Sequence, residues 1–467
     1  MLWNFIKSGM LRHPGSRLSE GDWSCTFAEA AAAAEHLAAQ LPPGKYAVRC
    51  ASELNAGLAL LACFAAGVTA IPLSERYGEV HCGRILSLTE PDYLLTDADG
   101  RIRAVPCAVP GGRASGAPDA DPALIMCTSG TTGTPKGAMI GAENLLANLS
   151  DIDRYFDLRC TDRILIARPL YHCAVLTGEF LISLMRGTQI RFYSEAMNPA
   201  ALAEEIVKEK ITVLCGTPTL FSLLSRLVRR MPDKPSLRLL VSSGECMGKA
   251  VASAIRQVFP DARVMNVYGL TEASPRVAYL PPELFDTHPD SVGYPLHSLR
   301  VRIVDASGAD VPRKTAGELL VAGPSVMRGY YRAPDADGKV LRGGWLHTGD
   351  IACMDEEGRI TIKCRKDNMI ILAGMNIYPQ EIECALRADP QIEDVLAFGA
   401  RDADGRQYIG VRVVAPGLDR DGIVAVCRRL LPAYERPSRI ELVDSLPKNA
   451  SGKLIRPSGK GESDARI

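Results

Sequence analysis

A run of small hydroxylated residues and glycines that ends in a lysine stands out at residues 128–137, Thr-Ser-Gly-Thr-Thr-Gly-Thr-Pro-Lys-Gly. Glycines let a backbone approach a ligand closely, and successive backbone N–H groups and hydroxyls can surround phosphate oxygens. The run is not a Walker A loop, because Pro135 precedes the lysine and a glycine follows it. A flexible linker is the alternative. We interpret the run as a triphosphate loop, with the candidate ligands Thr128, Ser129, Gly130, Thr131, Thr132, Gly133 and Lys136.

Two further segments carry groups suited to a nucleotide. Residues 268–272, Tyr-Gly-Leu-Thr-Glu, combine a ring that can stack on a base (Tyr268), a hydroxyl that can bond a phosphate (Thr271) and a carboxylate that can hold Mg²⁺ (Glu272). Taken alone, these five residues also fit a solvent-exposed turn. Asp350 ends the segment Trp-Leu-His-Thr-Gly-Asp, where it can accept hydrogen bonds from both ribose hydroxyls. The alternative for Asp350 is a hydrogen bond to its own turn.

These motifs need a scaffold, and most of the chain alternates between apolar strands and amphipathic helices. Examples are an expected helix at 54–66 followed by a strand at 68–73, and a helix at 249–258 followed by a strand at 263–267. The alternation predicts an α/β fold of parallel sheets covered by helices. Ligands of such sheets bind beyond the carboxyl ends of the strands. We therefore expect one common site from the motifs that follow strands, at residues 128–137, 171–172, 215–218, 243–245 and 268–272.

The pattern of expected strands and turns changes in the last third of the sequence. From about residue 291 the expected strands are shorter and glycine turns are more frequent, which predicts a small β-rich subdomain. A charged break at 365–367 marks the expected hinge. We predict a large N-terminal domain at 1–366 and a small α+β C-terminal domain at 367–467. Residues 101–121, rich in Gly, Pro and Ala, are expected to form a surface loop.

Composition limits the partners. The 467 residues include 54 basic and 54 acidic side chains, so the formal net charge is zero and no nucleic-acid partner is expected. The 14 cysteines are scattered without a CxxC pair, which indicates a reducing compartment, and we expect a cytoplasmic protein. An uncharged stretch at 54–74 is divided at Gly67 into helix and strand, so we expect no membrane span.

The run at 128–137 resembles the phosphate loop of the adenylate-forming enzymes, which include acyl-CoA synthetases, carrier-protein adenylation domains and firefly luciferase. Residues 268–272 are similar to the second motif of that superfamily, and residues 446–456 are similar to its last signature. The resemblance implies that Lys453 is the catalytic lysine and that Arg365 joins Asp350 at the ribose. It also implies further nucleotide contacts from Gly244, Glu245, Tyr268 and Gly269.

The resemblance implies a two-step reaction. A carboxylate attacks the α-phosphorus of Mg-ATP, and a thiol then attacks the acyl adenylate to give a thioester and AMP. The C-terminal domain rotates about Asp367, so that one orientation brings Lys453 to ATP and the other brings the Gly374 face to a thiol tunnel. The thiol is that of CoA or of the phosphopantetheine arm of a separate acyl carrier protein. A luciferase-like oxygenase or a non-catalytic binding relative would also carry most of these motifs.

The acid itself is less defined by the sequence. His172 follows Tyr171 where related acyl-CoA synthetases have an aromatic-His pair beside the acyl pocket, and its alternative is a pocket-wall histidine without a chemical role. Arg276 either pairs with a second substrate carboxylate or is a surface charge, which we favour; Glu179 can meet an amine. We expect a small or medium aryl or alkyl acid and a pocket lined by Tyr171, Cys173, Cys215, Gly216, Thr217 and Val267.

Overall fold

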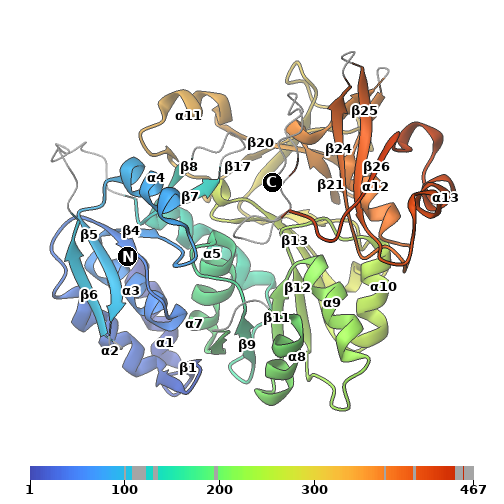
Figure 1. Cartoon of the computed structure of the whole chain (residues 1–467). Helices are drawn as coiled ribbons and strands as arrows, with labels where there is room; N and C mark the ends of the chain where they lie inside the picture. Colours follow the sequence, from blue (N-terminus) through green and yellow to red (C-terminus); the bar gives the residue numbers. More distant parts are fainter. Residues whose placement is uncertain are drawn as a thin grey trace.

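The computed structural model describes residues 1–98, 101–107, 122–129, 135–193, 198–372, 375–402, 406–447 and 456. Two large mixed sheets with their helices make up the N-terminal part, and smaller β-rich units follow them in the chain (Figure 1). The predicted α/β class is therefore confirmed.

The larger sheet has nine strands in the order β15-β14-β13-β12-β11-β9-β10-β1-β2. The strands from β13 to β1 run parallel, whereas β14 and β15 at one edge and β2 at the other are antiparallel. The bounds are β1 Arg17–Glu20, β2 Trp23–Thr26, β9 Arg163–Ile166, β10 Gln189–Phe192, β11 Val213–Gly216, β12 Leu239–Ser242, β13 Arg263–Gly269, β14 Arg276–Leu280 and β15 Tyr294–Pro295.

The second sheet has seven strands in the order β18-β8-β7-β4-β3-β5-β6. Its strands are β3 Lys45–Val48, β4 Thr69–Pro72, β5 Tyr93–Ala98, β6 Arg101–Pro106, β7 Leu124–Ser129, β8 Pro135–Ile140 and β18 Gly329–Tyr330. The prediction of a surface loop at 101–121 is wrong for the residues of β6, because this strand pairs antiparallel with β5 along its whole length. Most of β6 is exposed, so the strand has no apolar face that its sequence could reveal.

Helices pack on both sheets. The helix at Leu2–Arg12 is not among the predicted ones, and the bounds of most of the others are close to the expected bounds. The N-terminal helices are α1 Leu2–Arg12, α2 Phe27–Ala38, α3 Glu53–Ala66, α4 Glu79–Thr89 and α5 Ala142–Tyr155. Those of the nine-stranded sheet are α8 Pro199–Lys208, α9 Pro218–Val228 and α10 Lys249–Val258. Gly67 ends α3 with a φ of 69°, in the left-handed region that favours glycine, and so separates helix from strand where the sequence predicts.

One predicted helix, at 176–186, is irregular. It consists of a short helix α6 (Cys173–Val175), a π-helical segment (Leu176–Leu181) and α7 (Ile182–Arg186). A π-helical turn widens the helix by one residue and is frequent at functional sites. Every residue of this segment is buried, including Glu179, whose exposed fraction is 0%.

The expected β-rich subdomain is present as a five-stranded sheet. It comprises β16 Arg300–Val304, β17 Gly317–Ala322, β19 Leu341–Arg342, β20 Trp345–Met354 and β21 Ile360–Arg365, with α11 at Pro334–Val340. Its core includes Leu319, Val321, Leu346 and Ile360. Strand β20 pairs antiparallel with β17 on one side and β21 on the other, which brings residues 350 and 365 into register.

The last part of the chain has its own apolar core around Ile382, Val395, Val411 and Ile423. Its elements are β22 Ile370–Leu372, β23 Met375–Ile377, α12 Pro379–Leu386, β24 Asp394–Arg401, β25 Gln407–Val414, α13 Arg420–Leu430 and β26 Arg439–Leu442. It lies above α9 and α10 at the right of Figure 1. Lys363 donates to Glu381 at 2.7 Å across the predicted hinge. The domain boundary at residue 367 stays a prediction.

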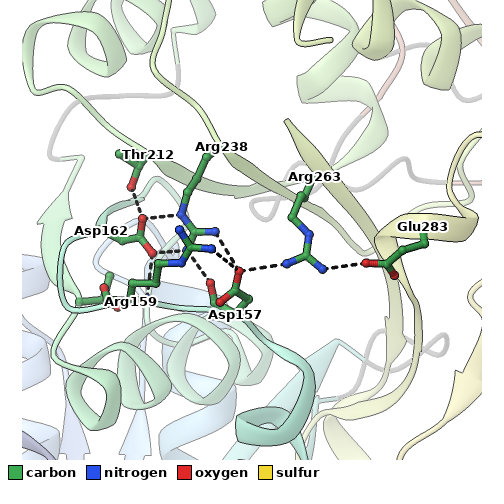
Figure 2. A network of polar contacts seen from close by, with 8 residues as sticks. Asp157, Arg159, Asp162, Thr212, Arg238, Arg263 and Glu283 are labelled. Carbon is green, nitrogen blue, oxygen red and sulfur yellow. Dashed lines mark hydrogen bonds and ion pairs between the residues drawn. The ribbon is translucent and has the colours of Figure 1, made fainter. Parts of the chain in front are cut away.

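A polar network joins the amino ends of four neighbouring strands of the nine-stranded sheet (Figure 2). Asp162 accepts from Thr212 at 2.9 Å and from Arg238 Nε at 2.7 Å. Arg263 connects Asp157 at 3.0 Å to Glu283 at 2.9 Å. Since ligands of parallel sheets bind at the opposite, carboxyl edge, we interpret this network as part of the scaffold.

Candidate functional site

The carboxyl end of β13 brings Tyr268 beside the acid of the β-rich subdomain. The Tyr268 hydroxyl donates to Asp350 Oδ2 at 2.5 Å, and Arg365 Nη1 donates to Asp350 Oδ1 at 3.3 Å. Burial and the negative charge of Asp350 raise the pKa of Tyr268 well above its usual value, so the hydroxyl remains a donor. Three residues that the sequence assigned to one nucleotide site are therefore in direct contact, although 82 residues separate Tyr268 from Asp350.

The backbone around Asp350 explains how the acid is held. The Thr348 hydroxyl donates to the Leu319 carbonyl at 2.7 Å and accepts from the Asp350 N–H at 3.0 Å. Gly349 has a φ of 69°, and a methyl group on it would come within 2.8 Å of the Arg365 guanidinium. This turn therefore needs glycine both for its conformation and for the close approach of Arg365.

A second group gathers around Tyr330 of β18. The Tyr330 hydroxyl donates to Glu272 Oε1 at 2.7 Å, and Lys136 Nζ lies 5.1 Å from the centre of the Tyr330 ring. Thr271 and Glu272 lie in a 3₁₀ turn between β13 and β14. The turn leaves β13 at Gly269, where a methyl group would come within 2.1 Å of the Pro275 carbonyl oxygen. The lysine and the carboxylate that the sequence predicts at the phosphates and Mg²⁺ thus converge on Tyr330.

Both ends of the predicted triphosphate run belong to strands, which the sequence did not predict. Its first residues end β7 and its last begin β8, so that Thr128 pairs with Lys136 and Ser129 with Pro135 in a hairpin. Gly137 lies within β8, and a methyl group on it would meet Ile125 at 2.6 Å. Gly130, Thr131, Thr132 and Gly133 lie outside the described residues. The hairpin places the apolar run and the lysine on neighbouring strands.

The predicted acyl pocket residues lie at the carboxyl ends of β9, β11 and β13. Tyr171, Cys173, Cys215 and Val267 are buried. The His172 ring is 4.2 Å from the Tyr171 ring. Burial and the nearby Arg168 charge lower the pKa of His172 to about 3, so the imidazole is neutral near neutral pH. Neutral His172 fits the wall of an apolar pocket better than it fits a group that neutralises phosphate charge.

Three of the predicted site residues lie in the turns that directly follow β11 and β12. Thr217 Oγ1 accepts from the Leu220 N–H at 3.2 Å and caps α9, directly after Gly216 of β11. Glu245 Oε2 accepts from the Thr219 hydroxyl at 2.6 Å, and Gly244 has a φ of 90°. The adenine-site role of Gly244 and Glu245 stays a prediction.

Charged side chains occupy the interior beside this pocket. Arg168, which follows β9, donates to Glu179 Oε1 at 2.6 Å and to Ser243 Oγ at 3.3 Å. The Glu179 carboxylate therefore engages an arginine of the chain itself. The expectation that Arg276 is a surface charge is wrong, because its side chain is 2% exposed. Short sequence context cannot reveal this burial, because Gly178, which packs against the Arg276 guanidinium, is distant in the sequence.

The structure describes the C-terminal signature only at residues 446, 447 and 456. Arg456 donates to both carboxylate oxygens of Glu383, at 2.6 and 3.0 Å, and to the Ala397 carbonyl at 2.7 Å. Read by charge alone, Arg456 would belong to a surface basic patch; instead its side chain is ion-paired with a buried acid. Asp367 is exposed in the turn after β21. Gly374 and Lys453 lie outside the described residues.

Sequence reasoning missed three participants. Tyr330 lies in the segment 323–331, which also resembles a segment of the adenylate-forming superfamily, but no role is predicted for it; Arg168 and Glu383 lie outside every motif. Tyr330 belongs to a Gly-Tyr-Tyr segment at 329–331, and an aromatic residue that follows a glycine in a predicted strand is only a weak signal. Arg168 and Glu383 have no local signal, because their partners are 11 and 73 residues away.

The fold and the nucleotide-type site together define a class. The chain belongs to the AMP-binding enzyme family, whose model matches residues 12–331. The model for the AMP-binding enzyme C-terminal domain matches residues 381–453.

Several known proteins are similar to this chain. A long-chain-fatty-acid–CoA ligase of Escherichia coli O6:H1 is 35% identical over 353 residues, which is 74% of this chain but only 63% of that ligase. A feruloyl-CoA synthase of Amycolatopsis sp is 34% identical over 417 residues, 85% of this chain and 84% of the synthase. The solved o-succinylbenzoate coenzyme A synthetase of Bacillus subtilis, in complex with ATP and magnesium ion, superposes with a TM-score of 0.84 at 26% identity, covering 98% of this chain and 99% of its own.

Proposed function

We propose that this protein activates a carboxylic acid with ATP to give an acyl adenylate and then transfers the acyl group to a thiol, in the manner of an acyl-CoA ligase. The observation that carries the proposal is a pair of contacts, from Tyr268 at the end of β13 to Asp350 and from Glu272 in the turn that follows β13 to Tyr330. These contacts hold the acid expected to bind the ribose and the carboxylate expected near the phosphates at the same end of β13. Family membership and the names of the relatives support the same chemistry.

The residues of the site fit ATP as a substrate. Asp350 has acceptor oxygens for ribose hydroxyls, and Arg365 beside it balances the charge of the acid. Lys136 and the Thr271 hydroxyl would contact the phosphates. No group of three or more His, Cys, Asp or Glu side chains able to hold a metal ion occurs within the described ranges. A single carboxylate, Glu272, suits Mg²⁺, which commonly uses few protein carboxylates together with substrate phosphates and supplies charge neutralisation there.

The reaction then needs positioning and charge stabilisation rather than a side-chain nucleophile. The substrate carboxylate attacks the α-phosphorus of ATP and pyrophosphate leaves, so one P–O bond forms as another breaks. A lysine at position 453 would stabilise the negative charge that develops in this transition state. The neutral His172 would shield the reacting carboxylate from water. A thiol then displaces AMP from the adenylate to form the thioester.

CoA is the thiol that we favour. The named relatives are CoA ligases or CoA synthases. A carrier-protein phosphopantetheine has the same thiol chemistry and remains the second candidate, because Asp367 and the Gly374 face would serve either thiol. No described helix has both the length and the apolar character needed to cross a membrane.

The test measures pyrophosphate released from Mg-ATP with a panel of aryl, alkyl and dicarboxylic acids, with and without CoA. Turnover with an acid and CoA is expected. Lys453→Ala should abolish acid-dependent pyrophosphate release but retain thioester formation from a supplied acyl adenylate. Arg412→Met, in an exposed ion pair with Glu441, serves as a control that retains both half-reactions. Unchanged pyrophosphate release in Lys453→Ala would refute the proposed role of the lysine, and formation of ADP instead of AMP would refute adenylation.

A further inference from the structure

Arg276 is an arginine in the protein interior that forms no ion pair with any described acid. Its side chain is 2% exposed. Among the residues that the structure describes, no hydrogen bond or ion pair reaches the Arg276 guanidinium, and its Nε is buried without a partner. A buried charge that is neither paired nor hydrogen-bonded costs several kcal/mol. An arginine in this state indicates that its partner is supplied from outside the described chain.

The position of Arg276 places this charge beside the predicted acyl pocket. Arg276 begins β14 and pairs with Gly269 of β13, the strand that carries Val267 two residues earlier. Its guanidinium packs against the π-helical segment, since a methyl group on Gly178 would come within 2.8 Å of Nε and of Nη2. The Arg276 charge also acts on the Cys215 thiol and the Glu179 carboxylate. The absence of a side chain at position 178 is what leaves room for the guanidinium.

The neighbouring charges do not balance Arg276. Glu179 is already held by Arg168 at 2.6 Å through Oε1. Glu179 Oε2 and Arg168 Nε are buried and have no hydrogen-bond partner among the described residues. Two guanidinium groups and one carboxylate leave a formal excess of one positive charge in this interior cluster. A ligand anion would remove that excess, and a carboxylate matches the fork of an arginine geometrically.

We infer that Arg276 binds a second carboxylate of the acid substrate, so that the preferred substrate is a dicarboxylic acid. This inference rests on the proposed function, because it identifies the acid that the adenylating site would take. A long alkyl chain in the same place would leave the guanidinium desolvated and unpaired. Arg276 is thus a specificity-determining residue, and this chain differs in substrate from a ligase for long-chain fatty acids.

The test is direct binding of acids to the full chain, measured by calorimetry without ATP. A series of linear diacids from malonate to sebacate is compared with monoacids of the same carbon number, and terephthalate is compared with para-toluate. We expect the best diacid to bind at least about 30-fold more tightly than its monoacid counterpart, the factor typical of a buried hydrogen-bonded charge pair. Arg276→Met should abolish the difference, and Arg276→Lys should restore part of it. Arg302→Met, a surface arginine paired with Asp310, should leave it unchanged.

Two measurements distinguish a failure of this inference from misfolding of the variant and from a failure of the proposed function. The unliganded Arg276→Met protein should melt at or above the wild-type temperature, because removing an unpaired buried charge does not destabilise a core. Equal affinity for diacids and monoacids in the wild type, or an undiminished preference in Arg276→Met, would overturn the inference. Preferential binding of diacids without any pyrophosphate release would uphold the role of Arg276 and refute adenylation instead.

Discussion

The ion pair between Arg456 and Glu383 is predicted to position Lys453, the lysine proposed to act in adenylation. Glu383 is 2% exposed and accepts from Arg456 at 2.6 and 3.0 Å. Lys453 is three residues before Arg456 in the chain, and three residues span at most about 10 Å. The anchored arginine therefore restricts the volume that the lysine can sample.

The magnitude follows from the contacts that remain. In Arg456→Met, the Glu383 carboxylate keeps the Ala397 N–H at 2.9 Å, while Arg387 lies 4.0 Å away. Breaking one side of a buried ion pair costs about 3–5 kcal/mol, so the C-terminal part should lose stability by that order. Adenylation should slow by about 100-fold or less, the loss associated with displacing a catalytic group by about 1 Å. Thioester formation from a supplied adenylate does not use Lys453 and should be retained.

The assay compares Arg456→Met, Glu383→Gln and the double variant in pyrophosphate release, thioester formation and urea unfolding. A double-mutant cycle isolates the pair, and the double variant should be less destabilised than the sum of the single changes. Arg412→Met removes an exposed pair with Glu441 at 2.8 Å and should cost under about 1 kcal/mol. An adenylation rate in Arg456→Met equal to that of Arg412→Met would refute the positioning role.

Three further outcomes are expected. Asp350→Asn removes the charged acceptor of Tyr268 and Arg365 and should raise KM for ATP by about 10- to 100-fold; an unchanged KM would contradict a ribose contact. Glu272→Gln should raise the Mg²⁺ concentration for half-maximal pyrophosphate release, and a normal metal titration would argue against Glu272 as ligand. Burial raises the pKa of Glu53 from 4.5 to about 7, so its contribution to stability is present below pH 4.5 and is lost as the pH rises through 7. The urea concentration at the unfolding midpoint should fall less between those pH values in Glu53→Gln than in the wild type. Parallel pH profiles of the two proteins would exclude Glu53 as the cause of the pH dependence.

Local sequence patterns determined most of the secondary structure of this protein. Helix α10 has the predicted bounds, and helix α3 and strands β4 and β13 lie within two residues of theirs, because the apolar pattern of each lies within the segment itself. The same holds for the glycine that separates α3 from β4. Motif residues such as Tyr268, Asp350 and Lys136 were also predictable, since their chemistry is recognisable from residue type and neighbours.

Tertiary structure alone decided which of these groups meet and which charges are buried. Strand β6 exists because it pairs with β5, and no apolar face marks it. The contacts Tyr330–Glu272 and Arg456–Glu383 join residues 58 and 73 positions apart. Arginine is a residue type usually found at the surface, yet Arg276 is buried, with its guanidinium against the π-helical segment. Burial and long-range pairing depend on how elements pack in three dimensions, and a side chain's type and near neighbours do not contain that information.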